Sequence, residues 1–296
     1  MRKFLTVLLA VCFLTMAAGG ALAAETIHVG AKNFTEQYVL GHLIVKILEN
    51  AGYDVDSTMG TGSTVTRKAL ETGQIDLYPE YTGTAWSLYL KHDSVIKDSE
   101  ELYQKVKEED LEKNGIVWLK PSEVNNTYAM AITEDATETM GTSLSELAAY
   151  VNENPEEVVF GINQEFYERS DGFFPMAEHY GMEIDRDQVR AMDTGLTFEA
   201  MERGQVDVTM VFATDAKIKK YNLFLLEDDK QFFPPYSLSV CIRKDVLDKN
   251  PDLAEVLAPM TELTDDVMQE LNYRVDVEGL PEEMVVEEYL KEQGII

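Results

Sequence analysis

The chain of 296 residues carries 25 lysine and arginine residues against 54 aspartate and glutamate residues, a formal net charge of −29. Such a negative surface repels nucleic acids and anionic lipids, which argues against functions that depend on binding them. Cys241 is the only cysteine after residue 12, so an intrachain disulfide and a cysteine-based metal site are excluded beyond that point.

The N-terminus is predicted to be a secretory signal peptide. Two cationic residues precede an apolar run that ends near Ala18, and "ALA" at 21–23 is a small-x-small cleavage site. The run is too short to span a membrane. Val11 stands directly before Cys12, where a lipobox requires a small residue, so a lipoprotein is not expected. We therefore predict that residues 1–23 are removed and that the protein is periplasmic.

From residue 26 onward, strands and helices alternate. The first set of predicted elements is strand, helix, strand, helix, strand with its exit loop, and helix, at 26–32, 35–52, 53–59, 63–73, 74–84 and 101–115. A second set has helices at 143–154, 173–181 and 196–204 and strands at 157–163, 205–213 and 223–229. Acidic helices are expected at the C-terminus. This alternation favours mostly parallel sheets covered by helices.

A helix–glycine–strand segment occurs twice. "KALETGQIDLYPEYTGT" at 68–84 is similar to "EAMERGQVDVTMVFATD" at 199–215, and each strand leads to an aromatic residue, Tyr81 in the first and Phe212 in the second. Ligands of open α/β sheets bind beyond the carboxyl ends of the strands. Two lobes of similar topology that face each other would therefore bring Tyr81 and Phe212 to opposite walls of one cleft.

A fainter repeat adds two more aromatic residues. "NTYAMAIT" at 126–133 matches "PPYSLSVCI" at 234–242 as a tyrosine followed by alternating small and apolar residues. Both segments lie where the chain would pass between the lobes, so Tyr128 and Tyr236 are predicted at the two crossings. Any one of these aromatic residues alone is more often part of a core, but the pairing across both repeats favours a binding site.

Six segments carry a family resemblance, in chain order: "GAKNFTEQ", "GQIDLYPEYTGT", "NNTYAM", "ERSDG", "LEDDKQFFPPY" and "MQELNYRVDVEG". Over essentially the whole mature chain, the sequence resembles the glycine betaine/carnitine/choline-binding proteins of osmoprotectant ABC importers. The resemblance implies the α/β fold of a type II periplasmic binding protein, with two lobes, two hinge crossings and a ligand cleft between them. Residues 24–127 would begin the first lobe, 128–235 would form the second, and 236–296 would return to the first. The implied partners are a membrane permease and an ATPase; a monomer without a cofactor is expected.

The expected ligand is a quaternary ammonium compound, with glycine betaine as the first candidate. A trimethylammonium group has no N–H donor, so aromatic faces hold it in place of hydrogen bonds. A carboxylate needs donors, and the planar fork of arginine can bind it at two points. The resemblance implies these site residues: a cage of Tyr81, Tyr128, Phe212 and Tyr236 with Asn126 beside it, and carboxylate donors Lys32, Thr84 and Arg169. A betaine would then bridge the lobes and stabilise their closed state.

Other function classes were weighed against this one. An enzyme is disfavoured, because the four histidines are scattered without metal-ligand spacing and no nucleophile motif is present. "GTGST" at 60–64 lacks the lysine of a P-loop, and it is expected to offer helix N-terminal N–H groups. Among binding proteins, choline, ergothioneine or an amino acid zwitterion is the alternative ligand. An amino acid ammonium group needs a buried carboxylate partner, for which Asp215 is the candidate.

Overall fold

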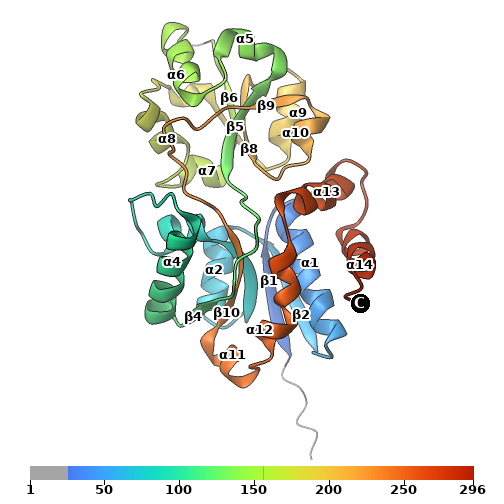
Figure 1. The fold of residues 1–296 in the computed structure, drawn as a ribbon. Coiled ribbons are helices and arrows are strands. Elements are labelled where there is room, and N and C mark those ends of the chain that lie inside the picture. The colour runs from blue at the N-terminus through green and yellow to red at the C-terminus, as the bar shows by residue number, and fades with distance from the viewer. Residues whose placement is uncertain (1–25, 156) are drawn as a thin grey trace, which may run out of the picture.

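The computed structural model describes residues 26–155 and 157–296, and the predicted signal peptide lies outside them. The described chain forms two lobes, each built around a five-stranded sheet with helices on both faces (Figure 1). We call the lobe that contains strand β1 the first lobe and the other the second lobe. No helix in the described ranges is long and apolar enough to cross a membrane.

The sheet of the first lobe has the strand order β2-β1-β3-β10-β4, in which β10 runs antiparallel to both of its neighbours. Its strands are β1 (Ile27–Lys32), β2 (Val55–Thr61), β3 (Leu77–Tyr81), β4 (Ile116–Trp118) and β10 (Leu238–Arg243). The helical elements of this lobe are α1 (Thr35–Asn50), α2 (Ser63–Glu71), α3 (Thr82–Thr84), the π-helical η1 (Ala85–Tyr89), α4 (Ser99–Asn114), α11 (Lys244–Lys249), α12 (Leu253–Val256), η4 (Ala258–Glu262), α13 (Asp265–Asp276) and α14 (Glu282–Glu292).

The sheet of the second lobe has the strand order β7-β6-β8-β5-β9, in which β5 runs antiparallel to both of its neighbours. Its strands are β5 (Tyr128–Thr133), β6 (Phe160–Asn163), β7 (Val189–Met192), β8 (Val208–Phe212) and β9 (Leu223–Leu225). Its helical elements are η2 (Glu134–Ala136), α5 (Thr137–Met140), α6 (Leu144–Glu153), α7 (Gln164–Glu168), α8 (Phe173–Tyr180), η3 (Arg186–Gln188), α9 (Leu196–Glu202) and α10 (Lys217–Lys220).

The two sheets share one topology. In each sheet, three parallel strands are followed by one antiparallel strand, and that strand, β10 or β5, is the one that enters from the other lobe. The duplicated segment occupies equivalent places, α2 to β3 in the first lobe and α9 to β8 in the second. The repeat in the sequence therefore corresponds to a repeat in the structure.

The glycine of the duplicated segment closes the helix in both lobes. Gly73 follows α2 with φ at +73°, and Gly204 follows α9 with φ at +63°. This left-handed conformation is nearly free for glycine and strained for other residues, which explains why glycine stands at both positions. The turn directs the chain from the helix straight into the parallel strand.

The aspartate of the duplicated segment fixes the start of the strand in both lobes. Asp76 accepts a hydrogen bond of 2.9 Å from the backbone N–H of His28 at the start of β1. Asp207 accepts one of 2.8 Å from the N–H of Val159, next to β6. Each carboxylate thus accepts a hydrogen bond from a backbone N–H near the start of the neighbouring strand, a donor that would otherwise lack a partner. The conservation of "[IV]-D-[LV]" between the two copies thus has a structural cause.

Helix α1 packs on the first sheet through one apolar face. Its buried residues recur at helical spacing and include Leu40, Leu43, Ile44 and Ile47. Each such side chain contributes about 1.5–3 kcal/mol by its burial. Residues after 236 lie on this lobe as well: β10 joins its sheet, and α13 and α14 pack beside α1 (Figure 1).

The two crossings between the lobes are hydrogen-bonded to each other. Asn125 and Ser237 form an antiparallel bridge. The backbone N–H of Asn126 donates to the carbonyl of Tyr236 at 3.2 Å, and the N–H of Tyr236 donates to Oδ1 of Asn125 at 2.7 Å. The lobes are therefore joined by a short two-stranded segment rather than by two independent linkers.

A buried ion pair in the first lobe provides a stability test. Arg67 on α2 binds both carboxylate oxygens of Asp110 on α4, which also accepts from the indole N–H of Trp118 at 2.7 Å. Arg67→Met leaves this buried carboxylate without its cation and should lower the free energy of unfolding by about 3–5 kcal/mol, measured by urea denaturation. The matched control is Arg203→Met, which removes an exposed pair with Glu199 and should cost about 0.5 kcal/mol or less. Equal losses in both variants would contradict the prediction.

Candidate ligand-binding site

A cavity of about 300 Å³ lies between the lobes and is lined by both of them and by both crossings. Strands β3 and β8 point their carboxyl ends at it, because Tyr81 ends β3 and Phe212 ends β8. Seven of the eight predicted residues line it, and all seven are buried: Tyr81, Tyr128, Phe212, Tyr236, Lys32, Thr84 and Asn126. The eighth, Arg169, is buried but does not line the cavity.

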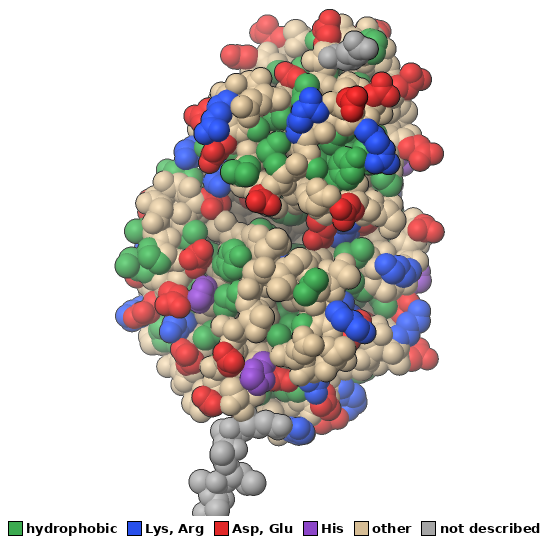
Figure 2. All heavy atoms as spheres, turned by 180° about the vertical axis from the view of Figure 1, so that it is seen from behind, with side chains coloured by type: hydrophobic (Ala, Val, Ile, Leu, Met, Phe, Trp, Pro, Cys, Tyr) green, Lys and Arg blue, Asp and Glu red, His purple; other side chains and the backbone are tan. Residues whose placement is uncertain are grey.

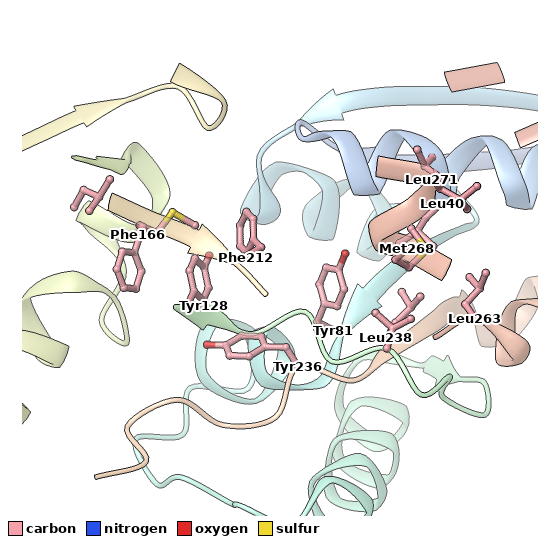
Figure 3. Packing of buried hydrophobic residues seen from close by; sticks show 14 of the residues in the cluster. Leu40, Tyr81, Tyr128, Phe166, Phe212, Tyr236, Leu238, Leu263, Met268 and Leu271 are labelled. Carbon is pink, nitrogen blue, oxygen red and sulfur yellow. The ribbon is translucent and has the colours of Figure 1, made fainter. Parts of the chain in front are cut away.

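Three of the predicted rings form one continuous wall. Tyr128 and Phe212 are directly paired across β5 and β8, and their ring centroids lie 5.0 Å apart. Tyr236 meets the ring of Tyr128 edge-on, with centroids 5.5 Å apart and planes at 78°. Figure 3 shows these three rings on one side and Tyr81 on the other. The β-sheet register and the paired crossings together determine this arrangement.

Phe34 is a fifth ring of the cavity that the sequence analysis missed. Its centroid lies 5.0 Å from that of Phe212 and 6.5 Å from that of Tyr81, so it connects rings of the two lobes. It lines the cavity from the turn between β1 and α1. The signal that could have found it is its position beyond the carboxyl end of a parallel strand, the same criterion that selected Tyr81.

Lys32 is held over the ring of Tyr81 by a buried carboxylate. Its Nζ is ion-paired with Glu80, a fully buried residue, and lies 4.9 Å from the centroid of the Tyr81 ring. Glu80 also accepts hydrogen bonds of 2.8 Å from the hydroxyls of Tyr78 and Tyr89. Lys32, the predicted donor to the ligand's carboxylate, is thus already paired with a carboxylate of the protein.

Glu36, also missed by the sequence analysis, lies behind the cage. Its carboxylate accepts hydrogen bonds from the hydroxyls of Tyr81 and Thr214, at 2.6 and 2.5 Å, and from the amide nitrogens of Asn126 and Asn272, at 2.8 and 3.3 Å. Burial raises the pKa of Glu36, while the hydrogen bonds from Thr214, Tyr81 and Asn272 oppose that rise.

Arg169 has every guanidinium nitrogen engaged. Its Nε and Nη2 bind Asp171 at 2.8 and 2.6 Å, and its Nη1 donates to Glu165 at 3.1 Å. Its Nη2 also lies 3.4 Å from the hydroxyl of Ser87 on the first lobe, and its Cζ lies 5.6 Å from the centroid of Tyr128. The fork therefore lies behind the cage wall, and the carboxylate of Asp171 occupies its Nε and Nη2 donors.

The N-terminus of α2 faces the cavity, as the glycine-rich segment before it suggests. Gly62, Ser63 and Thr64 all line the cavity. The N–H of Ser63 donates to Glu165 of the second lobe at 3.4 Å. Burial raises the pKa of Glu165, but Arg169, Lys32 and the hydrogen bond from Ser63 together outweigh it, so the pKa is lowered overall. A protein carboxylate thus already lies at this helix terminus, where partial positive charge favours an anion.

The surroundings of the cavity carry an excess of negative charge. Lys32 is accompanied by Glu80 and, through Tyr81, by Glu36, whereas Arg169 is accompanied by Asp171 and Glu165. On the outer surface, by contrast, carboxylates are scattered among lysine and arginine side chains over both lobes (Figure 2). Each of these two buried cations thus has two carboxylates near it. The resulting negative potential favours a cationic ligand.

Asp215 does not line the cavity. Its carboxylate accepts the backbone N–H of Phe212 at 2.8 Å, which fixes the turn after β8. Burial raises the pKa of Asp215 to about 7, and Asp276 and Glu36 add to the rise while Lys217 opposes it. The carboxylate considered as a partner for an amino acid ammonium group is therefore directed at the backbone instead.

Known proteins match this chain over most of its length. Residues 25–292 match the family described as the substrate binding domain of ABC-type glycine betaine transport systems. The chain is 39% identical over 286 residues to the glycine-betaine-binding protein of Pseudomonas aeruginosa, covering 94% of this chain and 91% of that protein. It is 33% identical over 281 residues to the glycine betaine-binding protein YehZ of Escherichia coli, covering 92% of each.

Solved structures show the same architecture. The structure of apo YehZ from Escherichia coli is 31% identical, with a TM-score of 0.67 over 92% of this chain and all of that one. A crystal structure described as a glycine betaine/carnitine/choline ABC transporter is 27% identical, with a TM-score of 0.73 over 91% of this chain and 99% of that one. These likenesses confirm the predicted type II fold of two α/β lobes.

The raised pKa of Asp215 predicts a pH-dependent gain of stability in Asp215→Asn. An unfolded aspartate titrates near 3.9, so between about pH 4 and pH 7 the folded protein binds more protons at this site than the unfolded chain, and stability falls as pH rises. The asparagine retains an acceptor for the N–H of Phe212 and has no charge to bury. Urea denaturation should therefore favour the variant by about 1–2 kcal/mol more at pH 8 than at pH 5.

The control is Asp245→Asn, which has the opposite sign. Arg243 lowers the pKa of Asp245, so its charge stabilises the folded state at pH 8 and its removal should reduce stability there. If Asp215→Asn shows the same stability difference from wild type at both pH values, Asp215 does not titrate in this range.

Proposed function

Because the chain belongs to the family of substrate-binding domains of ABC-type glycine betaine transport systems, we propose that it captures a quaternary ammonium compound, glycine betaine first, and delivers it to an ABC permease. The observation that carries the proposal is the buried aromatic cavity between the lobes, whose surrounding cations are outnumbered by carboxylates. A trimethylammonium group needs ring faces and a negative field, and it makes no use of hydrogen-bond acceptors.

The ligand's position explains why two lobes are required. Tyr81 belongs to the first lobe, Phe212 to the second, and Tyr128 and Tyr236 to the crossings. A cation between them contacts all of these parts only when the lobes are closed, so it favours the closed state by the difference in contacts. The lobe boundaries that we propose are 24–127 with 236–296, and 128–235.

The proposed setting follows from the same class of protein. Residues 1–23 act as a signal peptide that is cleaved after Ala23, and the mature chain works in the periplasm as a monomer. Its partners are the ligand, a membrane permease and an ATPase. It binds and releases the ligand without changing it, and it requires no cofactor.

A second candidate ligand, choline, is favoured by one specific observation. Lys32 is the only lysine or arginine of the described chain that lines the cavity, and it is paired with Glu80. Arg169 is bound by Asp171. A ligand with a hydroxyl group in place of a carboxylate would leave both pairs intact. For betaine, the proposed carboxylate contacts are Thr84, Lys32 and an Arg169 fork that releases Asp171 when the ligand enters.

The cage can be tested by substitution of its rings. Tyr236→Ala should weaken glycine betaine at least about tenfold, or 1.4 kcal/mol, measured by isothermal titration calorimetry, because one aromatic face is lost. Phe212→Tyr is the matched control, since it keeps the ring face and should leave the affinity nearly unchanged. If Tyr236→Ala binds as wild type does, the rings serve the core and not a ligand.

Arg169 distinguishes the two candidate ligands. Arg169→Ala should weaken glycine betaine at least about tenfold while changing choline much less, because a charge-assisted hydrogen bond to a carboxylate contributes about 1.5–3 kcal/mol and choline has no carboxylate. Arg169→Lys should restore only part of the loss. Calorimetry with both ligands decides the question: equal losses mean that Arg169 only supports the loop around Asp171, and a wild type that prefers choline assigns the site to choline.

A further inference from the structure

A buried carboxylate lies directly behind the cage. Glu36 is in the first turn of α1, is 3% exposed and does not line the cavity. Its Oε1 accepts a hydrogen bond of 2.6 Å from the hydroxyl of Tyr81, whose ring does line the cavity. One phenol ring therefore connects this carboxylate with the place proposed for the ligand's cation.

Both oxygens of Glu36 are surrounded by donors. Oε1 accepts from Nδ2 of Asn126 at 2.8 Å in addition to Tyr81, and Oε2 accepts from Oγ1 of Thr214 at 2.5 Å and Nδ2 of Asn272 at 3.3 Å. The hydroxyl of Thr214 also lies 2.9 Å from Oδ1 of Asn126, and its single proton serves only one of these two acceptors. Burial raises the pKa of Glu36, and the hydrogen bonds donated to the charged form oppose that rise and stabilise the ionised carboxylate.

The donors come from four different parts of the fold. Tyr81 ends β3, Asn126 lies in a crossing, Thr214 follows β8 of the second lobe, and Asn272 belongs to α13. The bond from Thr214 spans the two lobes, so separation of the lobes at this point would break it. Glu36 is therefore hydrogen-bonded both to a ring of the cage and to a residue of the opposite lobe.

We propose that Glu36 is the anionic partner of the bound cation and acts on it through Tyr81. Ionised Glu36 polarises the phenol hydroxyl and makes the ring face toward the cavity more negative, as connected hydrogen bonds polarise one another. Its bond to Thr214 at the same time favours the closed lobes. Glu36 is a positioning residue, because it contacts the cage and not the ligand. The inference rests on the quaternary ammonium ligand proposed above.

The need for Glu36 follows from Lys32. The ammonium of Lys32 lies 4.9 Å from the Tyr81 ring centroid and draws on the same ring that a ligand's cation would use. Glu80 is paired with Lys32, so those two charges offset each other. Glu36 supplies the negative charge in excess at this wall, and in a buried setting that charge acts more strongly than it would in water.

The test separates charge from shape with a pair of isosteric ligands. Glycine betaine and tert-butylacetate differ only in the quaternary atom, nitrogen in one and carbon in the other, so both fill the same space and only the first is a cation there. With the mature chain, Glu36→Gln should weaken glycine betaine about tenfold, or 1.4 kcal/mol, while tert-butylacetate changes less than about twofold. Calorimetry, with competition for the weaker ligand, measures both. If choline proves the better ligand, choline and its tert-butyl alcohol analogue replace the pair.

The glutamine fits the site with little rearrangement. Its oxygen can accept from Tyr81 and Asn126, and its NH₂ group can donate to Oγ1 of Thr214, which then donates to Oδ1 of Asn126. Tyr81→Phe is the second variant, because it keeps the ring and removes the connection to Glu36. In Tyr81→Phe, the ratio of the affinity for glycine betaine to that for tert-butylacetate should fall by about threefold or more. It decides the question if Glu36→Gln does not fold.

Thr214→Val is the matched control. It keeps the hydrogen bond between Glu36 and Tyr81 and removes one side-chain hydrogen bond between the lobes, so it should weaken both ligands by the same factor and leave their ratio unchanged. Equal losses of both ligands in Glu36→Gln, or an unchanged ratio in Tyr81→Phe, would overturn the role of Glu36. A wild type that binds neither quaternary ammonium ligand would instead overturn the proposed function, so the two failures are distinct.

Discussion

The pairing of the two crossings is the constraint on which the cavity depends. Asn126 donates to the carbonyl of Tyr236, and Asn125 accepts from its N–H, so the two strands that leave one lobe for the other are fixed against each other. Tyr128 and Tyr236 lie within two residues of these bonds, which places their rings 5.5 Å apart. Rings at a hinge change position little when lobes rotate about it. The cage can therefore be half-built before a ligand arrives.

The electrostatics around the cage follow one pattern in both lobes. Each lobe holds a cation in place with a carboxylate: Glu80 on the neighbouring strand β3 pairs with Lys32, and Asp171, close by in the chain, pairs with Arg169. A further carboxylate is added in each lobe: Glu36 lies behind Tyr81, and Glu165 lines the cavity itself. Burial of an isolated charge is costly, whereas a network in which each charge has partners is tolerated. The result is a negative field around the cage, to which carboxylates that line the cavity also contribute.

The duplicated segment explains how much of this could be predicted from sequence. The helix, the glycine, the aspartate and the terminal aromatic residue are set by local rules, and Tyr81, Phe212, Tyr128 and Tyr236 could be assigned to one cavity because the rules recur. Glu36 and the pairing of Arg169 with Asp171 could not. The partners of Glu36 stand 45, 90, 178 and 236 positions away along the chain, so only the folded structure reveals them. Phe34 was missed although its position beyond β1 follows the rule applied to Tyr81.

The place of β10 in the first sheet sets an order of assembly. Residues 128–235 contain all five strands of the second sheet in one uninterrupted stretch, β5 to β9. The first sheet, by contrast, needs β10 between β3 and β4, and β10 ends at Arg243. During synthesis from the N-terminus, all strands of the second sheet are available before the first sheet can be completed. The earlier half of the first lobe must then wait with the inner edges of β3 and β4 unpaired, and it is the part of the molecule most exposed to wrong strand pairing until the last fifth of the chain arrives.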